Sequence, residues 1–305
     1  MNWEESFGKK LAGFLSEGQI IFNAPMSEQT TFKIGGAADV LIFPANAAEV
    51  AQIFKLINEF QIPCTILGNG SNVLVRDNGI RGAVVKFTDK FFGTIRAEGT
   101  KIFAGAGAKL KDVSNFAAEN NLSGMEFAVG IPGSIGGAVF MNAGAYDGEM
   151  KNVIANVKAV TRDGELKNFC ANDLNLGYRQ SIFQSNDCAI CEVELNLQIG
   201  NGADIKNKMA DFTARRESKQ PLEFPSAGST FKRPAGYFAG TLIDQTGLKG
   251  LRVGDAQVST KHAGFVVNVG NATAADVLNL IEEVRRRVKE MHDVELIPEV
   301  RIIGE

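Results

Sequence analysis

Three glycine-rich segments in the first half of the chain constrain its fold more than any other feature. They are KIGGAAD (33–39), GNGSNV (68–73) and GIPGSIGGAVFMNAGAYDG (130–148). Glycine loses more conformational entropy on folding than any other residue, so dense clusters need a structural reason. Each segment could form ordinary turns, or its backbone could approach a ligand and direct N–H groups at phosphate oxygens. Three segments together favour a glycine-lined site for a phosphate-bearing ligand, and the turn alternative stays open.

None of these segments carries a standard nucleotide-binding motif. GNGSNV has the first two glycines of G-x-G-x-x-G and lacks the third, and the chain has no G-K-[ST] sequence of a P-loop. Both motifs depend on a glycine or lysine at a fixed position in the loop. A Rossmann-type nucleotide site is therefore disfavoured.

The size and charge of the chain exclude several classes of protein. A length of 305 residues corresponds to two or three domains. The net charge is -3, so there is no basic excess to bind nucleic acid or an anionic membrane surface. The N-terminus has no secretory signal pattern, and no run approaches the ~18 apolar residues of a membrane span. We therefore expect a cytoplasmic protein.

The cysteines and histidines leave little room for metal or histidine chemistry. Cys188 and Cys191 form a C-x-x-C within an alternating, strand-like stretch, and no second cysteine pair or nearby histidine completes a zinc set. Residues three apart on a strand point to opposite faces, so we expect a structural role for this pair. The only histidines are His262 and His292. We predict no metal site.

Periodicity predicts a β-α-β unit near the N-terminus, followed by further strands and helices. A strand at 39–44 precedes a helix with Asn46 as N-cap and Glu49 three residues later, and a second strand follows at 62–68. Residues 199–203 are predicted to be a linker. The remaining predicted strands are 82–87, 93–99, 101–107, 152–161, 165–169, 188–199 and 299–303, and the remaining predicted helices are 110–120, 204–216 and a Thr273-capped helix that ends at Glu290.

Several polar residues could be ordinary surface groups or parts of a site. Ser229 follows a glycine and could be a turn serine that bonds its own backbone. Arg179 and Glu299 could form exposed ion pairs of little energetic value. A basic set near Ser229 could be a solvated helix end, or could hold a phosphorylated ligand in a chain of negative net charge. That set is Arg215, Arg216, Lys219, Lys232 and Arg233.

Motifs along most of the chain resemble one enzyme family. They are, in order, TTFKIGGAADV, LGNGSNVLV, GIPGSIGGAVFMNAGAY, GYRQSIF, PSAGSTFKRP, GLKGLRVGDAQVSTKHAGFVVN and PEVRIIG. Their sequence and order, from about residue 20 to residue 304, are similar to those of the UDP-N-acetylenolpyruvoylglucosamine reductases, also called UDP-N-acetylmuramate dehydrogenases. Any one motif is weakly specific, whereas seven in family order are highly specific.

The resemblance implies an α+β fold with an FAD-binding module of the vanillyl-alcohol-oxidase type and a C-terminal α/β substrate-binding domain. We accordingly expect two FAD-binding subdomains at 1–85 and 86–199, and a substrate-binding domain at 204–305. No histidine lies in the glycine segments, so we predict FAD that is bound without a covalent link. The implied FAD contacts are Gly68, Asn69, Gly70, Ser71, Asn72, Gly130, Ile131, Pro132, Gly133, Ser134, Gly136 and Gly137.

The resemblance also implies the catalytic residues. Ser229 of AGSTF would donate a proton, the arginine of GYR would be Arg179, and the glutamate of PEVR would be Glu299. If Val300 and Ile302 face the core, Glu299 shares the opposite face of its strand with Arg301. The implied substrate contacts are Lys219, Lys232, Arg233, Gln245 and Lys261.

The implied reaction uses NADPH as co-substrate to reduce FAD, which then reduces the enolpyruvyl ether of UDP-N-acetylglucosamine. Ser229 would act across a domain boundary, because it is distant in sequence from the flavin loops. Only 33 residues separate Ser181 from Arg215, so the chain resembles the shorter class of the family, which lacks a segment with a substrate-contacting tyrosine. What replaces that tyrosine, and the oligomeric state, are not determined by the sequence, although a monomer is compatible with it.

Two other functions remain open at this point. A flavin oxidase of the same fold would act on another alcohol or sugar, would consume oxygen and would not use NADPH. A non-catalytic sensor of nucleotide sugars would keep the cationic residues, would need no flavin and would be colourless. The AGSTF and PEVR motifs argue against the flavin oxidase.

Overall fold

The computed structural model describes residues 3–305, which form two compact units. Unit 1 comprises Met1–Phe22, Val40–Asn69 and Gly82–Arg215, and unit 2 comprises Asn23–Asp39, Gly70–Arg81 and Arg216–Glu305. Neither unit is a continuous stretch of chain, whereas the domains predicted from the sequence are continuous. Two segments from the N-terminal half therefore belong to the unit that contains the C-terminus.

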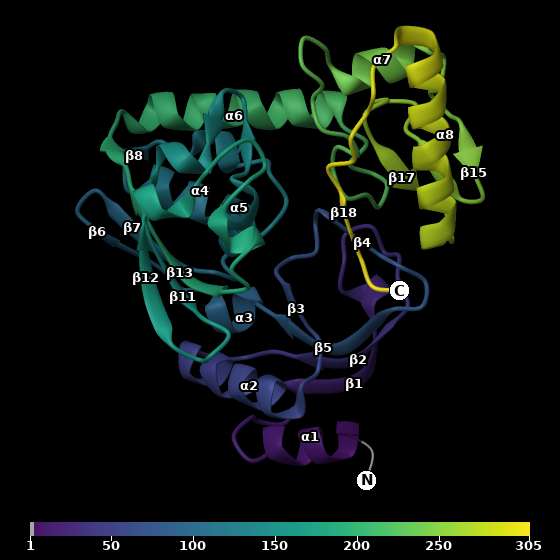
Figure 1. Cartoon of the computed structure of the whole chain (residues 1–305). Coiled ribbons are helices and arrows are strands. Elements are labelled where there is room, and N and C mark those ends of the chain that lie inside the picture. The colour runs from purple at the N-terminus through teal and green to yellow at the C-terminus, as the bar shows by residue number, and fades with distance from the viewer. Residues whose placement is uncertain (1–2) are drawn as a thin grey trace. The chain divides into compact units, whose positions relative to one another are not determined.

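The elements of both units have the following bounds (Figure 1). The helices are α1 (Trp3–Leu11), α2 (Ala47–Phe60), α3 (Asp89–Phe92), α4 (Leu110–Glu119), α5 (Ile135–Met141), α6 (Gly202–Lys219), α7 (Ala239–Gln245) and α8 (Ala274–His292). The strands are β1 (Ile20–Pro25), β2 (Ala37–Ile42), β3 (Cys64–Leu67), β4 (Val73–Val75), β5 (Ile80–Lys86), β6 (Ile95–Glu98), β7 (Lys101–Gly105), β8 (Leu122–Ser123), β9 (Gly144–Ala145), β10 (Gly148–Glu149), β11 (Ile154–Val160), β12 (Leu166–Cys170), β13 (Ala189–Asn196), β14 (Gln198–Ile199), β15 (Arg252–Val253), β16 (Ala256–Val258), β17 (Val266–Asn268) and β18 (Arg301–Ile303).

Unit 1 is built around a five-stranded antiparallel sheet with the strand order β12-β11-β13-β7-β6. Helix α5 contacts the central strands β13 and β7, and α4 lies beside α5. The first three residues of β13 are all buried, and from Cys191 onward buried residues alternate with more exposed ones, as expected for a strand with one face against a core. The sheet therefore provides a rigid base for the two loops that precede α4 and α5.

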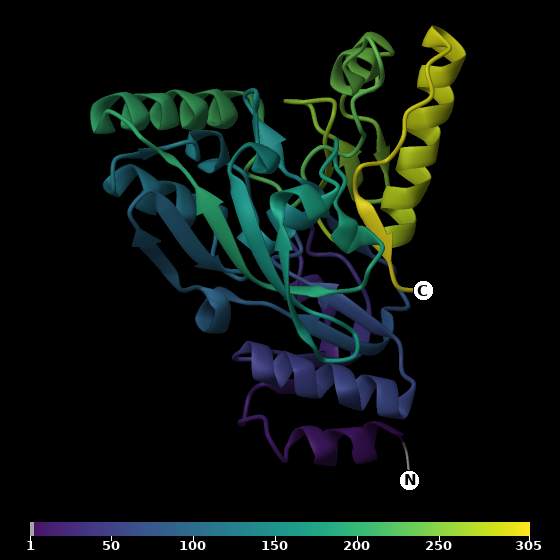
Figure 2. The ribbon, with the colours of Figure 1, turned by 60° about the vertical axis from the view of Figure 1, so that its left-hand side comes forward.

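A second sheet has the strand order β1-β2-β5-β3, and its strands β1, β2 and β5 each contribute residues to both units. The predicted Asn46 cap of α2 is confirmed, because its side chain accepts a hydrogen bond from the Glu49 N–H at 3.0 Å. Helices α1 and α2 lie side by side in both views (Figures 1 and 2), with Phe7 against Phe60 edge to face. The apolar face of α2 is buried in the core of unit 1.

Unit 2 combines the antiparallel sheet β15-β16-β17 with helices α7 and α8. The predicted capping residue Thr273 is confirmed, because it accepts a hydrogen bond from the Asp276 N–H at 3.0 Å. The buried stripe of α8 shares a core with Phe32, Ile34 and Leu74 from the N-terminal segments. Strand β4 pairs in parallel with β18, so the segment after the second glycine cluster joins the final strand.

Several features of the structure differ from the sequence prediction. The third glycine segment contains helix α5, because Ser134 caps it and Gly136 lies against Ala106, where an added Cβ would come within 2.9 Å. Helix α6 begins at Gly202, so part of the predicted linker is helical. Val300 is buried as expected, but Ile302 is 37% exposed, so the assumption that both face the core is wrong.

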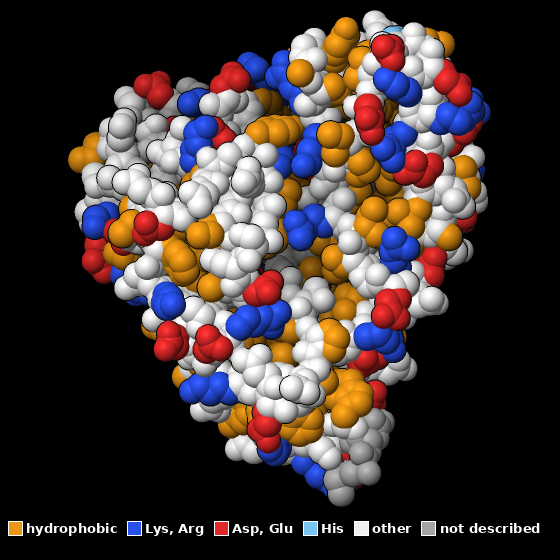
Figure 3. Space-filling view, viewed as in Figure 1, with side chains coloured by type: hydrophobic (Ala, Val, Ile, Leu, Met, Phe, Trp, Pro, Cys, Tyr) orange, Lys and Arg blue, Asp and Glu red, His pale blue; other side chains and the backbone are white. Residues whose placement is uncertain are grey.

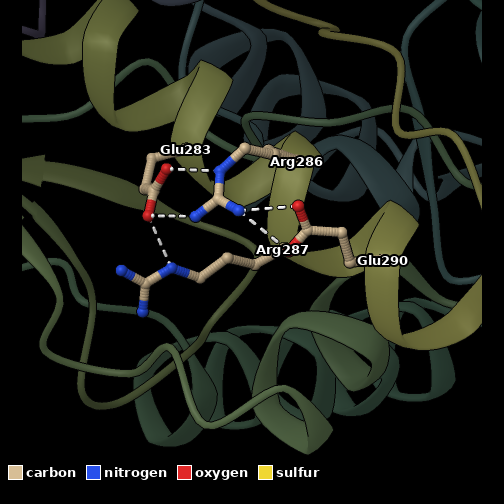
Figure 4. A network of polar contacts seen from close by, with 4 residues as sticks. All are labelled: Glu283, Arg286, Arg287 and Glu290. Atoms are coloured by element: carbon tan, nitrogen blue, oxygen red, sulfur yellow. Dashed lines mark hydrogen bonds and ion pairs between the residues drawn. The ribbon is translucent and has the colours of Figure 1, made fainter.

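Charged side chains of both signs are interspersed on the face of the molecule that Figure 3 shows. On α8, Glu283 accepts hydrogen bonds from Arg286 and Arg287, and Arg286 also binds Glu290 (Figure 4). The two guanidinium groups lower the pKa of Glu283 to about 2. The network therefore favours the ionised form of this carboxyl group.

We predict that Glu283→Gln removes a pH-dependent part of the stability. A lowered pKa in the folded state stabilises the fold above the unfolded value of about 4.3, and the contribution is lost as the pH falls toward about 2. The difference in melting temperature between wild type and variant should therefore shrink over this range, and also in high salt. A difference that stays constant with pH would contradict this assignment.

Candidate active site

The second and third glycine segments meet within unit 1. An added Cβ on Gly68 would come within 2.7 Å of the Ser134 Oγ. Gly68 follows β3, and Ser134 is the N-cap residue of α5, where its Oγ accepts from the Gly137 N–H at 3.4 Å. The two predicted FAD segments therefore approach each other at a point where a side chain on residue 68 would require Ser134 to move.

The loop at 130–137 is fixed by hydrogen bonds to the segment that precedes α4. The N–H groups of Ile135 and Gly136 donate to the carbonyl oxygens of Ala108 and Ala106, at 2.8 and 2.9 Å. The Leu110 N–H donates to the Gly133 carbonyl at 3.0 Å. Gly136 thus allows close packing of two backbones, which is a use of glycine other than a turn.

The turn that carries Arg179 is attached to the other end of α5. Ser181 Oγ and Gln184 Nε2 both donate to the Phe140 carbonyl, at 2.7 and 2.9 Å. The Asn142 amide donates to the Gly177 carbonyl at 2.9 Å. Helix α5 therefore connects the candidate FAD loop at its N-terminus with the arginine turn at its C-terminus.

Arg179 has an unusual backbone conformation. Its φ is 55°, which is uncommon for a residue with a side chain and typically persists where surrounding contacts impose it. Gln184 Nε2 donates to the Arg179 carbonyl at 3.0 Å, and Gly177 pairs with Gln180 across the turn. The guanidinium group lies 5.2 Å from the centre of the Tyr178 ring. The turn thus presents a half-buried arginine from a fixed backbone.

In unit 2, Ser229 lies between a glycine with a positive φ and the buried Thr230. Gly228 has a φ of 75°, and an added Cβ there would meet nothing within 4 Å. Thr230 is 4% exposed, donates its N–H to the Gly264 carbonyl at 2.8 Å, and accepts from the Val266 N–H at its Oγ1 at 2.9 Å. The Ser229 side chain is therefore exposed, whereas the adjacent Thr230 is held in place by hydrogen bonds.

The same threonine connects Ser229 with Glu299. The Glu299 N–H donates to the Thr230 carbonyl at 2.8 Å, and Phe231 pairs with Pro298 in an antiparallel bridge. The structure thus brings two of the predicted catalytic residues onto adjoining backbones of unit 2, although 69 positions separate them in the sequence. Arg179 belongs to unit 1.

The predicted substrate contacts have varied surroundings in unit 2. The Lys232 N–H donates to the Ile297 carbonyl at 2.8 Å, three positions after Ser229, and Arg233 lies 4.0 Å from the centre of the Phe238 ring. Lys261 Nζ donates to the Glu217 carbonyl at 2.8 Å, and Lys219 interacts electrostatically with His262. Gln245 ends α7, where its neighbour Thr246 contacts His292 at 3.2 Å.

The sequence GNGSN is divided between the two units. Gly68 and Asn69 belong to unit 1, whereas Gly70, Ser71 and Asn72 belong to unit 2. An added Cβ on Gly70 would come within 2.6 Å of the Gln29 carbonyl oxygen, so this glycine fits tightly against the first segment of unit 2. The Asn72 side-chain amide donates to the Glu299 carbonyl at 3.3 Å.

The C-x-x-C cysteines are both buried in the core of unit 1. Burial raises the pKa of the Cys191 thiol to about 12, which favours the protonated form. In the part of the chain from residue 3 onward, no three His, Cys, Asp or Glu side chains form a possible metal set. No helix within that part is long and apolar enough to cross a lipid bilayer.

Comparison with known proteins identifies the family. A family model for the C-terminal domain of UDP-N-acetylenolpyruvoylglucosamine reductase matches residues 220–303, and a model for an FAD binding domain matches residues 38–169. The reductase of this name from Clostridium perfringens is 54% identical over 304 residues, which cover 100% of this chain and 99% of that protein. The chain belongs to the UDP-N-acetylenolpyruvoylglucosamine reductase family. A family member from Geobacillus thermodenitrificans is 50% identical over the full length of both chains.

Solved structures agree with this assignment. The crystal structure of the reductase from Thermus caldophilus has a TM-score of 0.80 and 36% identity, and covers 93% of this chain and 98% of its own. Alkyldihydroxyacetonephosphate synthase is 13% identical with a TM-score of 0.50 over 64% of this chain, a likeness of fold alone. The predicted family and the predicted α+β fold, with an FAD-binding module and a C-terminal domain, are confirmed.

This member of the family is an FAD-dependent oxidoreductase, as predicted. The residues of unit 1 fit the cofactor, because Gly68 leaves a space beside Ser134 that a Cβ would fill. Close approach of backbone to a dinucleotide is what glycine permits at such a point. The contacts of individual residues with FAD, and its non-covalent attachment, stay predictions.

Two residues that position the site were not found from the sequence. Thr230 lies beside Ser229 in the same motif, but its three partners are distant in sequence. Asp77 follows the second glycine segment, and its carboxylate accepts the N–H groups of Ala274 and Ala275 at 2.7 and 2.9 Å. An aspartate near a glycine loop gives no signal of capping a helix almost 200 positions away.

We predict that Gly68→Ala weakens retention of FAD by about tenfold or more, because the added methyl group would require Ser134 to move. Gly177→Ala is a matched control for this measurement, since its added methyl group would stand 3.4 Å from the Gln180 side chain, an ordinary contact distance. The dissociation constant for FAD can be measured by fluorescence. Equal affinity in Gly68→Ala and wild type would contradict a cofactor site at this point.

Proposed function

We propose that this enzyme uses NADPH to reduce the enolpyruvyl ether of UDP-N-acetylglucosamine to the lactyl ether of UDP-N-acetylmuramic acid. The observation that carries the proposal is the hydrogen bond from the Glu299 backbone N–H to the Thr230 carbonyl. It joins the two motifs that are expected to act at the reacting carbon. The curated relatives that match over the full chain carry the name of this activity. The reaction adds one hydride and one proton across a carbon–carbon double bond, and NADPH supplies the two electrons.

When it is bound, FAD supplies the hydride that adds to the terminal methylene carbon of the enol ether. Ser229 then donates a proton from its hydroxyl group to the neighbouring carbon, which carries the carboxylate. A serine hydroxyl is a weak acid, so it can donate only to a strongly basic carbon and only from a fixed position. The anchored backbone at Thr230 supports this role, because it restricts the movement of the adjacent serine.

Arg179 would pair with the carboxylate of the enolpyruvyl group and stabilise the negative charge that develops there. The Arg179 backbone is held by the contacts of its turn, so its position is fixed before the substrate binds. Glu299 would help to orient the reacting group beside Ser229. Of the other predicted contacts, Lys219, Lys232, Arg233 and Lys261 would hold the diphosphate and carboxylate charges of the substrate, and Gln245 would offer a neutral amide to it.

The predicted FAD segments would bind the cofactor pyrophosphate through backbone N–H groups and by close approach at glycine. The meeting of Gly68 with Ser134 supports this assignment. We expect FAD to dissociate on denaturation, since His262 and His292 lie outside both glycine segments.

The two halves of the reaction can be followed separately in the anaerobic protein. NADPH should bleach the yellow absorbance of FAD, and subsequent addition of enolpyruvyl-UDP-N-acetylglucosamine should restore it. Steady-state consumption of NADPH should depend on the same substrate. Failure of the substrate to restore the absorbance would refute the proposed function, and turnover of simple sugars with oxygen would favour a flavin oxidase.

We predict that Ser229→Ala retains the reduction of FAD by NADPH but loses reduction of the substrate by several orders of magnitude, because only the second half requires the proton. Both half-reactions can be measured by stopped-flow absorbance. Ser226→Ala serves as a control in the same segment, since the Ser226 backbone carbonyl makes the contact to Thr31 and is kept. An equal loss in both halves would contradict the role of Ser229.

A further inference from the structure

We propose that Asn72 is a positioning residue that holds Glu299 in place for the reduction of the substrate. The inference rests on the proposed function, and it gives Asn72 a role different from the cofactor contact expected from its motif. All of the residues that carry it belong to unit 2.

Asn72 contacts the segment of Glu299 and Arg301 through both its side chain and its backbone. Its Nδ2 donates to the Glu299 carbonyl at 3.3 Å, and its own carbonyl accepts from the Arg301 N–H at 3.0 Å. The parallel pairing of β4 with β18 begins at the next residue, Val73, opposite Arg301. Asn72 therefore sets where the strand begins and how its preceding peptide is oriented.

The Glu299 backbone is held from two directions. Its N–H donates to the Thr230 carbonyl at 2.8 Å, and its carbonyl accepts from the Asn72 side chain. One partner comes from the Ser229 motif and the other from the GNGSN motif. Loss of the Asn72 amide would remove the hydrogen bond to the Glu299 carbonyl, so the Glu299 carboxylate could shift relative to Ser229.

The segment that carries Asn72 is itself firmly attached to unit 2. Gly70 lies against the Gln29 carbonyl, and the Arg76 N–H donates to the Ile303 carbonyl at 2.9 Å. Asp77 caps α8 with both carboxylate oxygens. Because both ends of the segment are anchored, the Asn72 side chain is a preorganised donor, which is the requirement for a residue that positions another.

The test compares the Asn72→Ala and Asn72→Asp holoenzymes with the wild-type holoenzyme. Each Asn72 substitution is made alone and also in combination with Glu299→Gln. Aspartate has the shape of asparagine, but as a carboxylate it cannot donate to the Glu299 carbonyl. It also provides the comparison if the alanine variant fails to fold. Asn78→Ala is the matched control, because it removes an exposed asparagine from the same segment.

We expect both Asn72 variants to reduce the substrate about 10- to 100-fold more slowly, which is the range expected for a displacement of about 1 Å at a reacting centre. The fall should be in kcat more than in KM. The dissociation constant for FAD and the rate of FAD reduction by NADPH should stay within about twofold of wild type. In the Glu299→Gln background, Asn72→Ala should add little further loss, because residues that act through one another are not additive.

Three results would overturn the inference. Release of FAD or an equal fall of both half-reactions would make Asn72 a cofactor contact. A loss that adds in full to that of Glu299→Gln would make its role independent of Glu299. An unchanged rate of substrate reduction in both variants would remove the role altogether. Failure of wild type to reduce the substrate would instead refute the proposed function, so the two failures are distinguishable.

Discussion

The backbone of Thr230 is the constraint on which the candidate site in unit 2 depends. Its N–H and its side-chain oxygen bind the segment that contains Gly264 and Val266, and its carbonyl binds the Glu299 N–H. Thr230 is buried, so the loss of any of these bonds would leave a polar group without a partner and cost about 1–3 kcal/mol. Three segments that are distant in sequence are thereby held in register beside Ser229, a residue that could act as an acid only from a fixed position.

In unit 1, glycine residues and the short helix α5 hold together segments that are distant in the sequence. Gly68 meets Ser134 at the N-terminus of α5, and the turn of Arg179 is bound to the Phe140 carbonyl near its C-terminus. The predicted cofactor loop and the turn that carries Arg179 are thus attached to the two ends of α5. A change in the packing of α5, for instance at Gly136 against Ala106, would be expected to disturb both together.

Local signals in the sequence predicted much of this structure. Asn46 is predicted as a helix cap because Glu49 lies three residues later, and the structure shows the same spacing between the predicted cap Thr273 and Asp276. Helix α5 was missed because two adjacent glycines are poor helix formers, and only the packing against Ala106 explains them. The division of GNGSN between two units, and the cap that Asp77 provides for α8, depend on contacts between residues far apart in the chain. The catalytic set came from resemblance of motifs, whereas its anchoring at Thr230 required the structure.

The central claim is that a positioned serine completes the reduction of an enolpyruvyl ether by protonating one carbon. The configuration of that carbon in the product tests the claim. Hydride addition creates a methyl group, and protonation of the neighbouring carbon creates a new stereocentre. The NMR spectrum of the product from complete turnover of enolpyruvyl-UDP-N-acetylglucosamine with NADPH reports on both. A single methyl doublet, from one configuration, is the result expected if the proton comes from a fixed Ser229. Two methyl doublets, or no new methyl group, would contradict the account.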